Sequence, residues 1–230
     1  MLKSDLFDSF DFKSNLILDQ ISKQNLDLIG SKFETISFNK GDKIFYEDGI
    51  PTGMFQIVSG RVKKYKTVID SHQQIFYVYI ENDFFGYHAL LCSERYHDTC
   101  EAIEPTVINF LSKENFNILL KEIPGLKEGF LKNIAHEFGV LGNIIGVLTQ
   151  KSLTARLALN IIVLNYRFNK KSENFEGFEL SREDLANIIG TSRESLSRSL
   201  NELKSKGFIR TEKRKIIILN EKSMLDYCMN

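Results

Sequence analysis

The sequence predicts an α+β protein with three parts: a β-roll, one long helix and a C-terminal winged helix-turn-helix. Short β-like segments separated by Gly, Asn and Asp fill residues 35–111, which is typical of a double-stranded β-helix, or jelly roll. A heptad repeat of apolar side chains follows within residues 125–150. Near the C-terminus, two helices joined at Gly190 precede a charged hairpin. We therefore expect a roll with flanking helices over 1–123, a dimerisation helix over 124–150 and a winged helix-turn-helix over 151–230.

The first part is expected to be mostly strands. Turn-forming pairs such as Gly41-Asp42, Ser59-Gly60 and Asn82-Asp83 separate apolar and β-branched runs. Short strands at regular spacing favour a double-sheet roll, with helices over 12–30 and 112–122 on either side of it. The expected strands are 43–46, 55–58, 61–68, 74–80 and 106–111.

The long helix carries apolar residues at alternating spacings of three and four, which is the pattern of a coiled-coil seam. A helix that only covered its own domain would need a wider apolar face, and Val140 and Ile144 do widen this one. We favour a parallel dimer seam, with part of the helix also touching the roll. The seam residues are Leu131, Ile134, Phe138, Leu141, Ile145 and Leu148.

After a hinge at 150–152, a helix over 153–167 and a polar linker over 169–177, the chain predicts two helices that meet at Gly190. A glycine there can end the first helix in the left-handed conformation. In the second, Leu196, Leu200 and Leu203 form a buried stripe. Arg193, Glu194, Ser197 and Arg198 lie on another side of this helix. Arg pairs with guanine and Glu accepts from cytosine, so this face can read bases in a major groove.

A simpler interpretation of the same residues is helix capping. Thr191 and Glu194 have capping-box spacing, as Ser181 and Asp184 do at the preceding helix, and the arginines could be solvated charges. The hairpin expected over 208–218 favours DNA binding, because its basic tip suits phosphate. The candidate DNA contacts are Ser181, Thr191, Ser192, Arg193, Glu194, Ser197, Arg198, Lys213, Arg214 and Lys215.

Charge is distributed unevenly between the two parts of this 230-residue chain. Residues 1–150 carry 15 Lys/Arg and 20 Asp/Glu, a balance of −5, whereas residues 151–230 carry 15 and 10, a balance of +5. A positive C-terminal part suits a polyanion partner. No apolar run is long enough to span a membrane, and three cysteines without a Cys-x-x-Cys motif favour a cytoplasmic protein.

In this order of parts, the chain resembles the CRP–FNR family of bacterial transcription regulators, whose roll is a cyclic-nucleotide-binding domain. The resemblance implies base contacts by Arg193, Glu194 and Arg198, an inverted-repeat site with half-sites near TTGA or TGTGA, and double-stranded DNA, a second copy and RNA polymerase as partners. The motifs that carry it are Lys40-Gly41-Asp42, Ser59-Gly60-Arg61-Val62, Asp83-Phe84-Phe85-Gly86, Thr154-Ala155-Arg156-Leu157-Ala158 and the run from Ile189 to Arg198.

The chain departs from the nucleotide pocket that this resemblance implies. The family's Gly-Glu pair is Gly86-Tyr87 here, its Arg-Ser pair falls on Tyr96-His97, and its adenine-binding Thr-Ser pair falls on Leu141 and Gly142. A buried phosphate without an Arg fork would be poorly compensated, so we do not expect cyclic AMP to bind in the usual way. Arg95 could be a displaced substitute. The candidate pocket residues are Phe85, Gly86, Tyr87, His88, Arg95, Tyr96, His97 and Leu141.

The sequence does not identify another effector or cofactor. The family's N-terminal cysteine cluster for an iron–sulfur centre is absent, and isolated histidines such as His88, His97 and His136 are weak indications of haem. We expect no metal site. A small apolar or aromatic ligand, or none, stays open. No Gly-x-x-x-x-Gly-Lys, His-Glu-x-x-His or Gly-x-Ser-x-Gly motif indicates an enzyme.

The alternative to a DNA-binding regulator is a sensor or scaffold. In that case the roll binds a ligand or protein, and the helix-turn-helix serves protein contacts rather than DNA.

Overall fold

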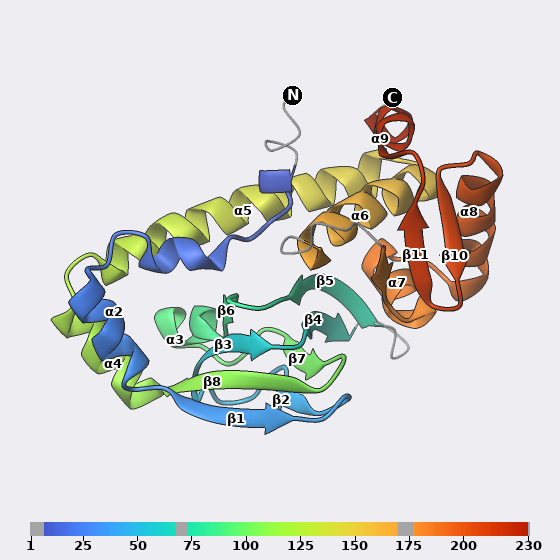
Figure 1. Ribbon diagram of the computed structural model, residues 1–230. Helices are drawn as coiled ribbons and strands as arrows, with labels where there is room; N and C mark the ends of the chain where they lie inside the picture. Colours follow the sequence, from blue (N-terminus) through green and yellow to red (C-terminus); the bar gives the residue numbers. More distant parts are fainter. Residues whose placement is uncertain (1–6, 68–72, 170–176, 230) are drawn as a thin grey trace. The chain divides into compact units, whose positions relative to one another are not determined.

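A computed structural model describes residues 7–67, 73–169 and 177–229 of the chain (Figure 1). The chain divides into two compact units, one of residues 12–138 and one of residues 139–230 together with the segment up to Asp11. The boundary falls inside one helix, α5 (Leu126–Gln150). The sequence led us to expect this helix as a part of its own.

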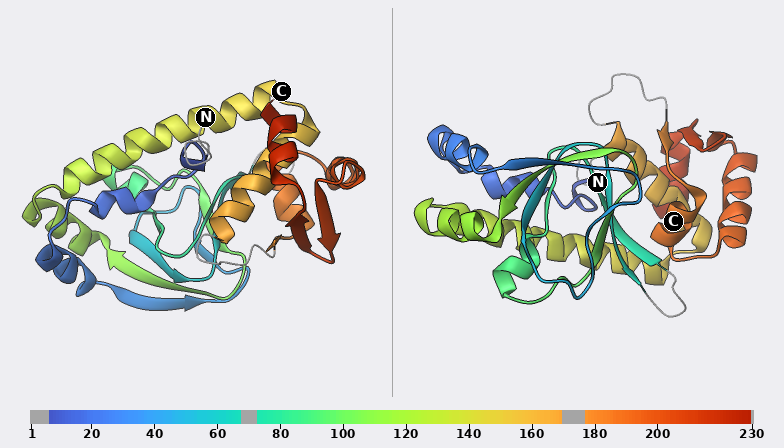
Figure 2. Two further views of the ribbon diagram at one scale, coloured as in Figure 1. Left: turned by 45° about the horizontal axis from the view of Figure 1, so that its top comes forward. Right: turned by 90° about the horizontal axis from the view of Figure 1, so that it is seen from below.

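Within the described residues, the first unit is a roll of two antiparallel four-stranded sheets (Figures 1 and 2). One sheet has the order β1 (Glu34–Phe38), β8 (Thr106–Ser112), β3 (Gly53–Ser59), β6 (Phe84–Phe85). The other has the order β2 (Lys43–Phe45), β7 (Thr99–Ala102), β4 (Val62–Thr67), β5 (Gln73–Tyr79). The double-sheet roll predicted from the strand spacing is therefore confirmed.

Helices lie at both ends of the roll sequence. The region expected to be helical over 12–30 is divided into a 3₁₀ helix, η1 (Ser14–Leu18), and α2 (Lys23–Gly30). The short helix α3 (Tyr87–Cys92) follows β6, and α4 (Lys113–Glu122) follows β8 as expected. The backbone of η1 approaches α5 so closely that a Cβ at Gly129 would lie 2.2 Å from the carbonyl oxygen of Ile17. Glycine is required there by space rather than by helix propensity.

The roll interior is filled with aromatic rings. Phe45 stacks on Tyr96 with ring centroids 3.8 Å apart, and Phe85 lies 5.2 Å from Phe55 and 5.0 Å from Tyr79. Each of these five side chains is at most 7 % exposed. Burying this much aromatic surface is a large contribution to the stability of the unit.

The second unit is a winged helix-turn-helix (Figures 1 and 2). Helix α6 (Leu153–Phe168) contacts α7 (Arg182–Ile189), α8 (Arg193–Ser205) and α9 (Glu221–Met229). Gly190 ends α7 with φ 70° and ψ 56°, the left-handed cap that was predicted. The wing is the hairpin of β10 (Ile209–Glu212) and β11 (Lys215–Ile218).

Two elements of this unit were not predicted. Strand β9 (Phe178–Glu179) pairs with β11 and makes the wing sheet three-stranded within the described residues, and α9 packs on α6. Most of the linker expected over 169–177 lies outside the described residues, as does Val68 at the end of the strand expected over 61–68.

Candidate nucleic-acid interface and sensor pocket

Helix α8 has one buried and one exposed face. Leu196, Leu200 and Leu203 are 0–5 % exposed and pack in the core of the second unit. The four expected base-reading residues, Arg193, Glu194, Ser197 and Arg198, are all exposed and lie in the first two turns of the helix. The structure therefore brings these four together on the surface that a DNA-reading helix would present.

Capping of α8 uses Ser192 rather than Thr191, which corrects the capping box inferred from spacing. The Ser192 hydroxyl accepts a hydrogen bond from the backbone N–H of Ser195 at 3.2 Å. Glu194, in the first turn, bonds to its own backbone N–H and to Ser192, and these bonds together with the two nearby arginines lower its pKa. Glu194 is thus a helix-end carboxylate that is also free to face solvent. Arg198 donates a 3.1 Å hydrogen bond to the Ser195 hydroxyl, and the Ser197 hydroxyl donates to the Arg193 carbonyl at 2.9 Å.

Ser181 has a mainly structural position. Its hydroxyl caps α7 by accepting from the N–H of Asp184 at 2.9 Å, as the spacing of these two residues predicted. The side chain is half-buried. Of the ten candidate DNA contacts, Ser181, Ser192 and Glu194 therefore have a structural partner at a helix end.

The wing tip is a two-residue turn of Lys213 and Arg214, with Lys213 in the left-handed region at φ 53°. Arg182, at the start of α7, donates to both turn carbonyls, at 3.3 Å to Lys213 and 3.5 Å to Arg214. Burial lowers the pKa of Arg182. Sequence reasoning missed this arginine because nothing in its spacing pairs it with a turn thirty residues away. Arg182 holds the basic wing tip to the helix-turn-helix.

A second set of hydrogen bonds joins α8 to α6 and α9. The Thr154 hydroxyl donates to Glu202 at 2.8 Å, and the Tyr227 hydroxyl donates to the other oxygen of the same carboxylate at 3.0 Å. These hydrogen bonds lower the pKa of Glu202. Glu202 therefore joins α8 to α6 and α9, and its carboxylate has partners within the protein.

In the roll, the pocket candidates separate into buried and exposed groups. Phe85 and Tyr87 are 0 % exposed and Tyr96 is 3 % exposed, so these side chains form the core. Gly86 has φ +83°, and a Cβ there would lie 2.8 Å from the ring of Phe55. Arg95 and His97 lie outside this core, in the loop after α3. Leu141 belongs to the other compact unit.

A buried polar network connects α3 to the long helix. The Tyr87 hydroxyl donates to Glu137 Oε1 at 2.5 Å, and His88 Nε2 lies 2.5 Å from Glu137 Oε2. The side-chain amide of Asn133 reaches both the Tyr87 oxygen, at 2.7 Å, and Glu137, at 3.0 Å. Because Tyr87 stands where the resemblance places a ribose-binding Glu, the chain itself occupies this position with a phenol.

The charge of Glu137 is compensated within the roll. Burial alone would raise its pKa, but the hydrogen bond and charge of His88, the Tyr87 hydroxyl and the charge of Lys64 outweigh burial and lower it. Burial and the nearby carboxylate raise the pKa of Tyr87 well above its ordinary value, so Tyr87 stays a donor. Lys64 itself lies 3.1 Å from Asp98. Glu137 and Lys64 were not among the predicted site residues, because a lone charge in a helix or strand gives no sequence signal for burial.

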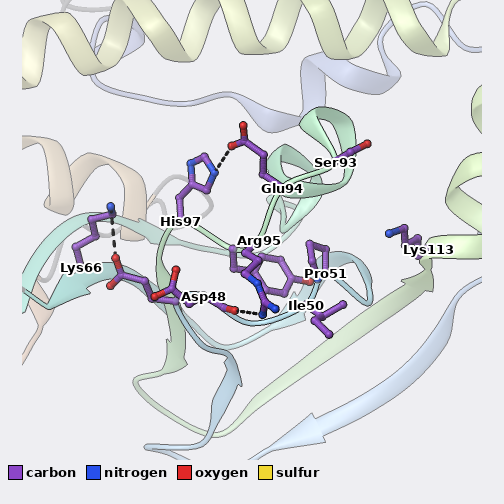
Figure 3. A pocket seen from close by; sticks show the side chains of 11 residues that line it. Asp48, Ile50, Pro51, Lys66, Ser93, Glu94, Arg95, His97 and Lys113 are labelled. Carbon is purple, nitrogen blue, oxygen red and sulfur yellow. Dashed lines mark hydrogen bonds and ion pairs between the residues drawn. The ribbon is translucent and has the colours of Figure 1, made fainter.

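Outside the core, an open hollow of about 740 Å³ lies beside the loop after α3 (Figure 3). Arg95 crosses part of it and donates to the Asp48 carbonyl at 2.7 Å. His97 Nε2 lies 2.6 Å from Glu94. Arg95 is exposed and gives one of its donors to this backbone carbonyl, and its use as a displaced phosphate ligand stays a prediction.

The expected seam on α5 is largely uncovered in the single chain. Leu131, Phe138, Leu141 and Ile145 are 69 %, 79 %, 38 % and 59 % exposed. Val140, on the other side of the helix, is 2 % exposed, whereas the contact of this part of the helix with the roll stays a prediction. Added Cβ atoms at Gly139, Gly142 and Gly146 would meet nothing within 4 Å. The stripe is therefore largely exposed in the single chain, and a dimer seam along it stays a prediction.

The described helices include none whose length and apolar content would let it span a bilayer. Cys92, Cys100 and Cys228 form no disulfide in the described part of the chain.

Comparison with known proteins gives two matched domains. Residues 35–122 match the cyclic nucleotide-binding domain, and residues 155–227 match the Crp-like helix-turn-helix domain. The cyclic AMP receptor protein of Thermus thermophilus is 23 % identical over 207 residues, which cover 86 % of this chain and 89 % of that protein. The fumarate and nitrate reduction regulatory protein of Escherichia coli is 24 % identical over 187 residues, covering 80 % and 74 %.

Solved structures share the fold. FixK2 from Bradyrhizobium japonicum superposes with a TM-score of 0.74 at 21 % identity, covering 84 % of this chain and 96 % of that one. A transcriptional regulator of the CRP/FNR family from Thermus thermophilus gives a TM-score of 0.68 at 22 % identity, covering 86 % and 99 %.

Proposed function

The chain belongs to the CRP/FNR family of transcription regulators, with a helix-turn-helix DNA-binding domain, and from this premise we propose that it acts as a homodimer on an inverted-repeat site. Members of this family bind DNA and act as dimers. The observation that carries the proposal is the polar face of α8, where Arg193, Glu194, Ser197 and Arg198 are exposed opposite a buried leucine stripe.

In this proposal, Arg193 and Arg198 read guanines and Glu194 reads a cytosine or adenine amino group, all in the one major groove that α8 enters. Lys213, Arg214 and Lys215 bind phosphate through the wing, with Arg182 holding the turn in place. Thr191 and Ser192, at the start of α8, lie where backbone and hydroxyl groups meet a phosphate. Two copies joined along the α5 seam place two such helices about one DNA turn apart.

Cyclic AMP is not the proposed effector. Tyr87 and Tyr96, which stand where the resemblance places the family's Glu and Arg, are buried in the core, and neither residue can neutralise a phosphate. An effector can act only if it binds two conformations of the dimer with different affinities. Helix α5 is the element that connects the roll to the DNA-binding unit. RNA polymerase is the proposed further partner.

Selection of bound sites from random duplex DNA, followed by a salt-titrated gel shift, tests the proposal. We expect an inverted repeat, and affinity that falls steeply as salt rises because phosphates release counterions on binding. A protein that binds neither a palindromic site nor bulk DNA at low salt would instead support the alternative, a sensor or scaffold whose helix-turn-helix contacts proteins. A parallel titration with cyclic AMP should leave the affinity unchanged.

A further inference from the structure

We propose that Cys92, Glu94 and His97 form a binding site for a divalent cation of the zinc type, on the loop that follows α3. The thiol, carboxylate and imidazole ligand atoms of these residues all lie within 4.8 Å of one another. In the described part of the chain no other three His, Cys, Asp or Glu residues meet in this way. The sequence did not indicate the site, because Cys-x-Glu-x-x-His is not a recognised metal spacing.

The loop backbone places the three side chains on one side. Cys92 is the last residue of α3, and Ser93 turns the chain with a left-handed φ of 60°. The N–H of Glu94 then donates to the Ala89 carbonyl at 3.1 Å, which folds the loop back over the end of the helix. His97 Nε2 lies 2.6 Å from a Glu94 oxygen, and Figure 3 shows these two side chains pointing toward one another. Two of the three ligands are thus already together.

The donor set selects the ion. A thiolate, an imidazole and a carboxylate suit Zn²⁺ or Co²⁺, whereas Mg²⁺ and Ca²⁺ prefer oxygen ligands alone. Ligand bonds of about 2.0–2.3 Å place donor atoms roughly 3–4 Å apart, so metal binding requires small side-chain shifts, with the 2.6 Å His97–Glu94 pair opening to admit the ion. As the S–metal bond forms, the thiol proton passes to solvent. Three protein ligands leave a fourth position open to water or another small donor.

All three side chains are exposed, so an ion can reach them from solvent without opening the fold. Cys100 and Cys228 differ in this respect, because both are buried. Burial raises the pKa of both thiols, to about 11 for Cys228, which makes them poor sources of thiolate. Cys92 is therefore the one cysteine of the chain suited to bind an added metal.

The position of the site gives it a route to the long helix. Helix α3 carries Cys92 at its end and Tyr87 and His88 at its start, and both of these bond to Glu137 of α5. A metal at the loop would fix the far end of the same six-residue helix. That metal binding regulates DNA binding in this way rests on the proposed function, whereas metal binding itself does not.

The test is a Co²⁺ titration of full-length, tag-free, reduced protein without DNA, followed by absorption. We expect one ion per chain, with thiolate-to-cobalt charge-transfer absorption that an excess of Zn²⁺ removes. Cys92→Ser should abolish the charge-transfer band, and His97→Ala and Glu94→Gln should each weaken Co²⁺ binding by at least about tenfold. Cys228→Ser is the matched control and should bind as the wild type does. Thermal unfolding of each variant checks that the fold is kept.

Three results would overturn the site: no charge-transfer band in the wild type, a band that survives Cys92→Ser, or unchanged affinity in His97→Ala. A gel shift with and without Zn²⁺, on wild type and Cys92→Ser, then measures the regulatory step separately. Loss of all DNA binding there would refute the proposed function and leave the cobalt result standing.

Discussion

Tyr87 and Glu137 join α3 to the long helix through a 2.5 Å hydrogen bond between two buried side chains. The Glu137 carboxylate also bonds to His88 and to the side-chain amide of Asn133, so with Tyr87 its two oxygens have three partners. Buried polar groups are tolerated only when they are satisfied in this way. The contact between the roll and α5 is therefore specific, since any shift of α5 against α3 must break bonds that water cannot easily replace.

Removing the Tyr87 hydroxyl tests the strength of this connection. We expect Tyr87→Phe to lower the free energy of unfolding by about 1–3 kcal/mol, because a buried carboxylate loses a donor. Chemical denaturation measures it. Tyr46→Phe, at a side chain that is 60 % exposed, is the control and should change stability by less than about 0.5 kcal/mol. Equal losses of unfolding free energy in the two variants would show that the Tyr87–Glu137 hydrogen bond contributes no more to stability than an exposed hydroxyl does.

The lowered pKa of Glu137 predicts how stability depends on pH. Because the pKa in the folded state lies below the ordinary value of 4.5, the charge of Glu137 contributes stability that is fully present above that value. The contribution is lost as pH falls through the folded-state pKa. The unfolding free energy of the wild type minus that of Glu137→Gln should thus shrink as pH falls from about 5 through the folded-state pKa. A difference that grows as pH falls would mean that burial dominates and the pKa is raised.

Sequence periodicity predicted the elements whose residues carry a local pattern. The leucines of α8 recur at helical spacing and Gly190 ends α7, so both helices and the turn could be placed from the sequence. The apolar repeat from Leu131 to Leu148 likewise predicted one long helix here, and the expected bounds of 124–150 lie within two residues of α5. In each case the pattern lies within a few helical turns, and the packing of the folded protein favours the same helix that the pattern predicts.

Features that depend on long-range pairing could not be predicted. Strand β9 is two residues long and exists because it pairs with β11, some forty residues later. In the sequence, Glu137 is one of several polar residues on an amphipathic helix. Its burial depends on Tyr87 and His88 of α3, which bond to its carboxylate. The Cys92–Glu94–His97 cluster depends on the left-handed turn at Ser93. This conformation is uncommon for residues other than glycine, so the sequence does not predict it.

Arg198 and Arg214 should separate base reading from phosphate binding. We expect Arg198→Ala to cost about 1–3 kcal/mol at the selected site and to relax the preference at one base pair, since an Arg–guanine pair is specific. Arg214→Ala, on the wing turn, should weaken selected and random DNA alike and reduce the salt dependence. Competition gel shifts at fixed salt measure both. An equal loss on both DNAs for Arg198→Ala would contradict the base-reading role.

Phe138 is the sharpest test of the α5 seam. Its side chain is 79 % exposed in the single chain, so Phe138→Asp should leave the folded chain intact and place like charges together across a dimer. Sedimentation velocity should then show a monomer. Lys132→Asp, on the same helix but outside the heptad positions, is the control and should stay dimeric. A stable dimer for Phe138→Asp would refute the seam.

Arg182 predicts that the wing acts through its fixed position as well as its charge. Its guanidinium spans the carbonyls of Lys213 and Arg214, and Arg182→Ala removes both hydrogen bonds without touching the basic tip. With each of the two bonds worth about 0.5–1.5 kcal/mol, their loss costs the fixed position of the wing about 1–3 kcal/mol, so affinity for selected and random DNA should fall by up to roughly 5- to 150-fold. Arg182→Lys keeps the charge but cannot span two carbonyls, so it should restore only part of the loss. Fluorescence anisotropy at two salt concentrations measures these affinities, and full recovery in Arg182→Lys would mean that Arg182 acts by charge alone.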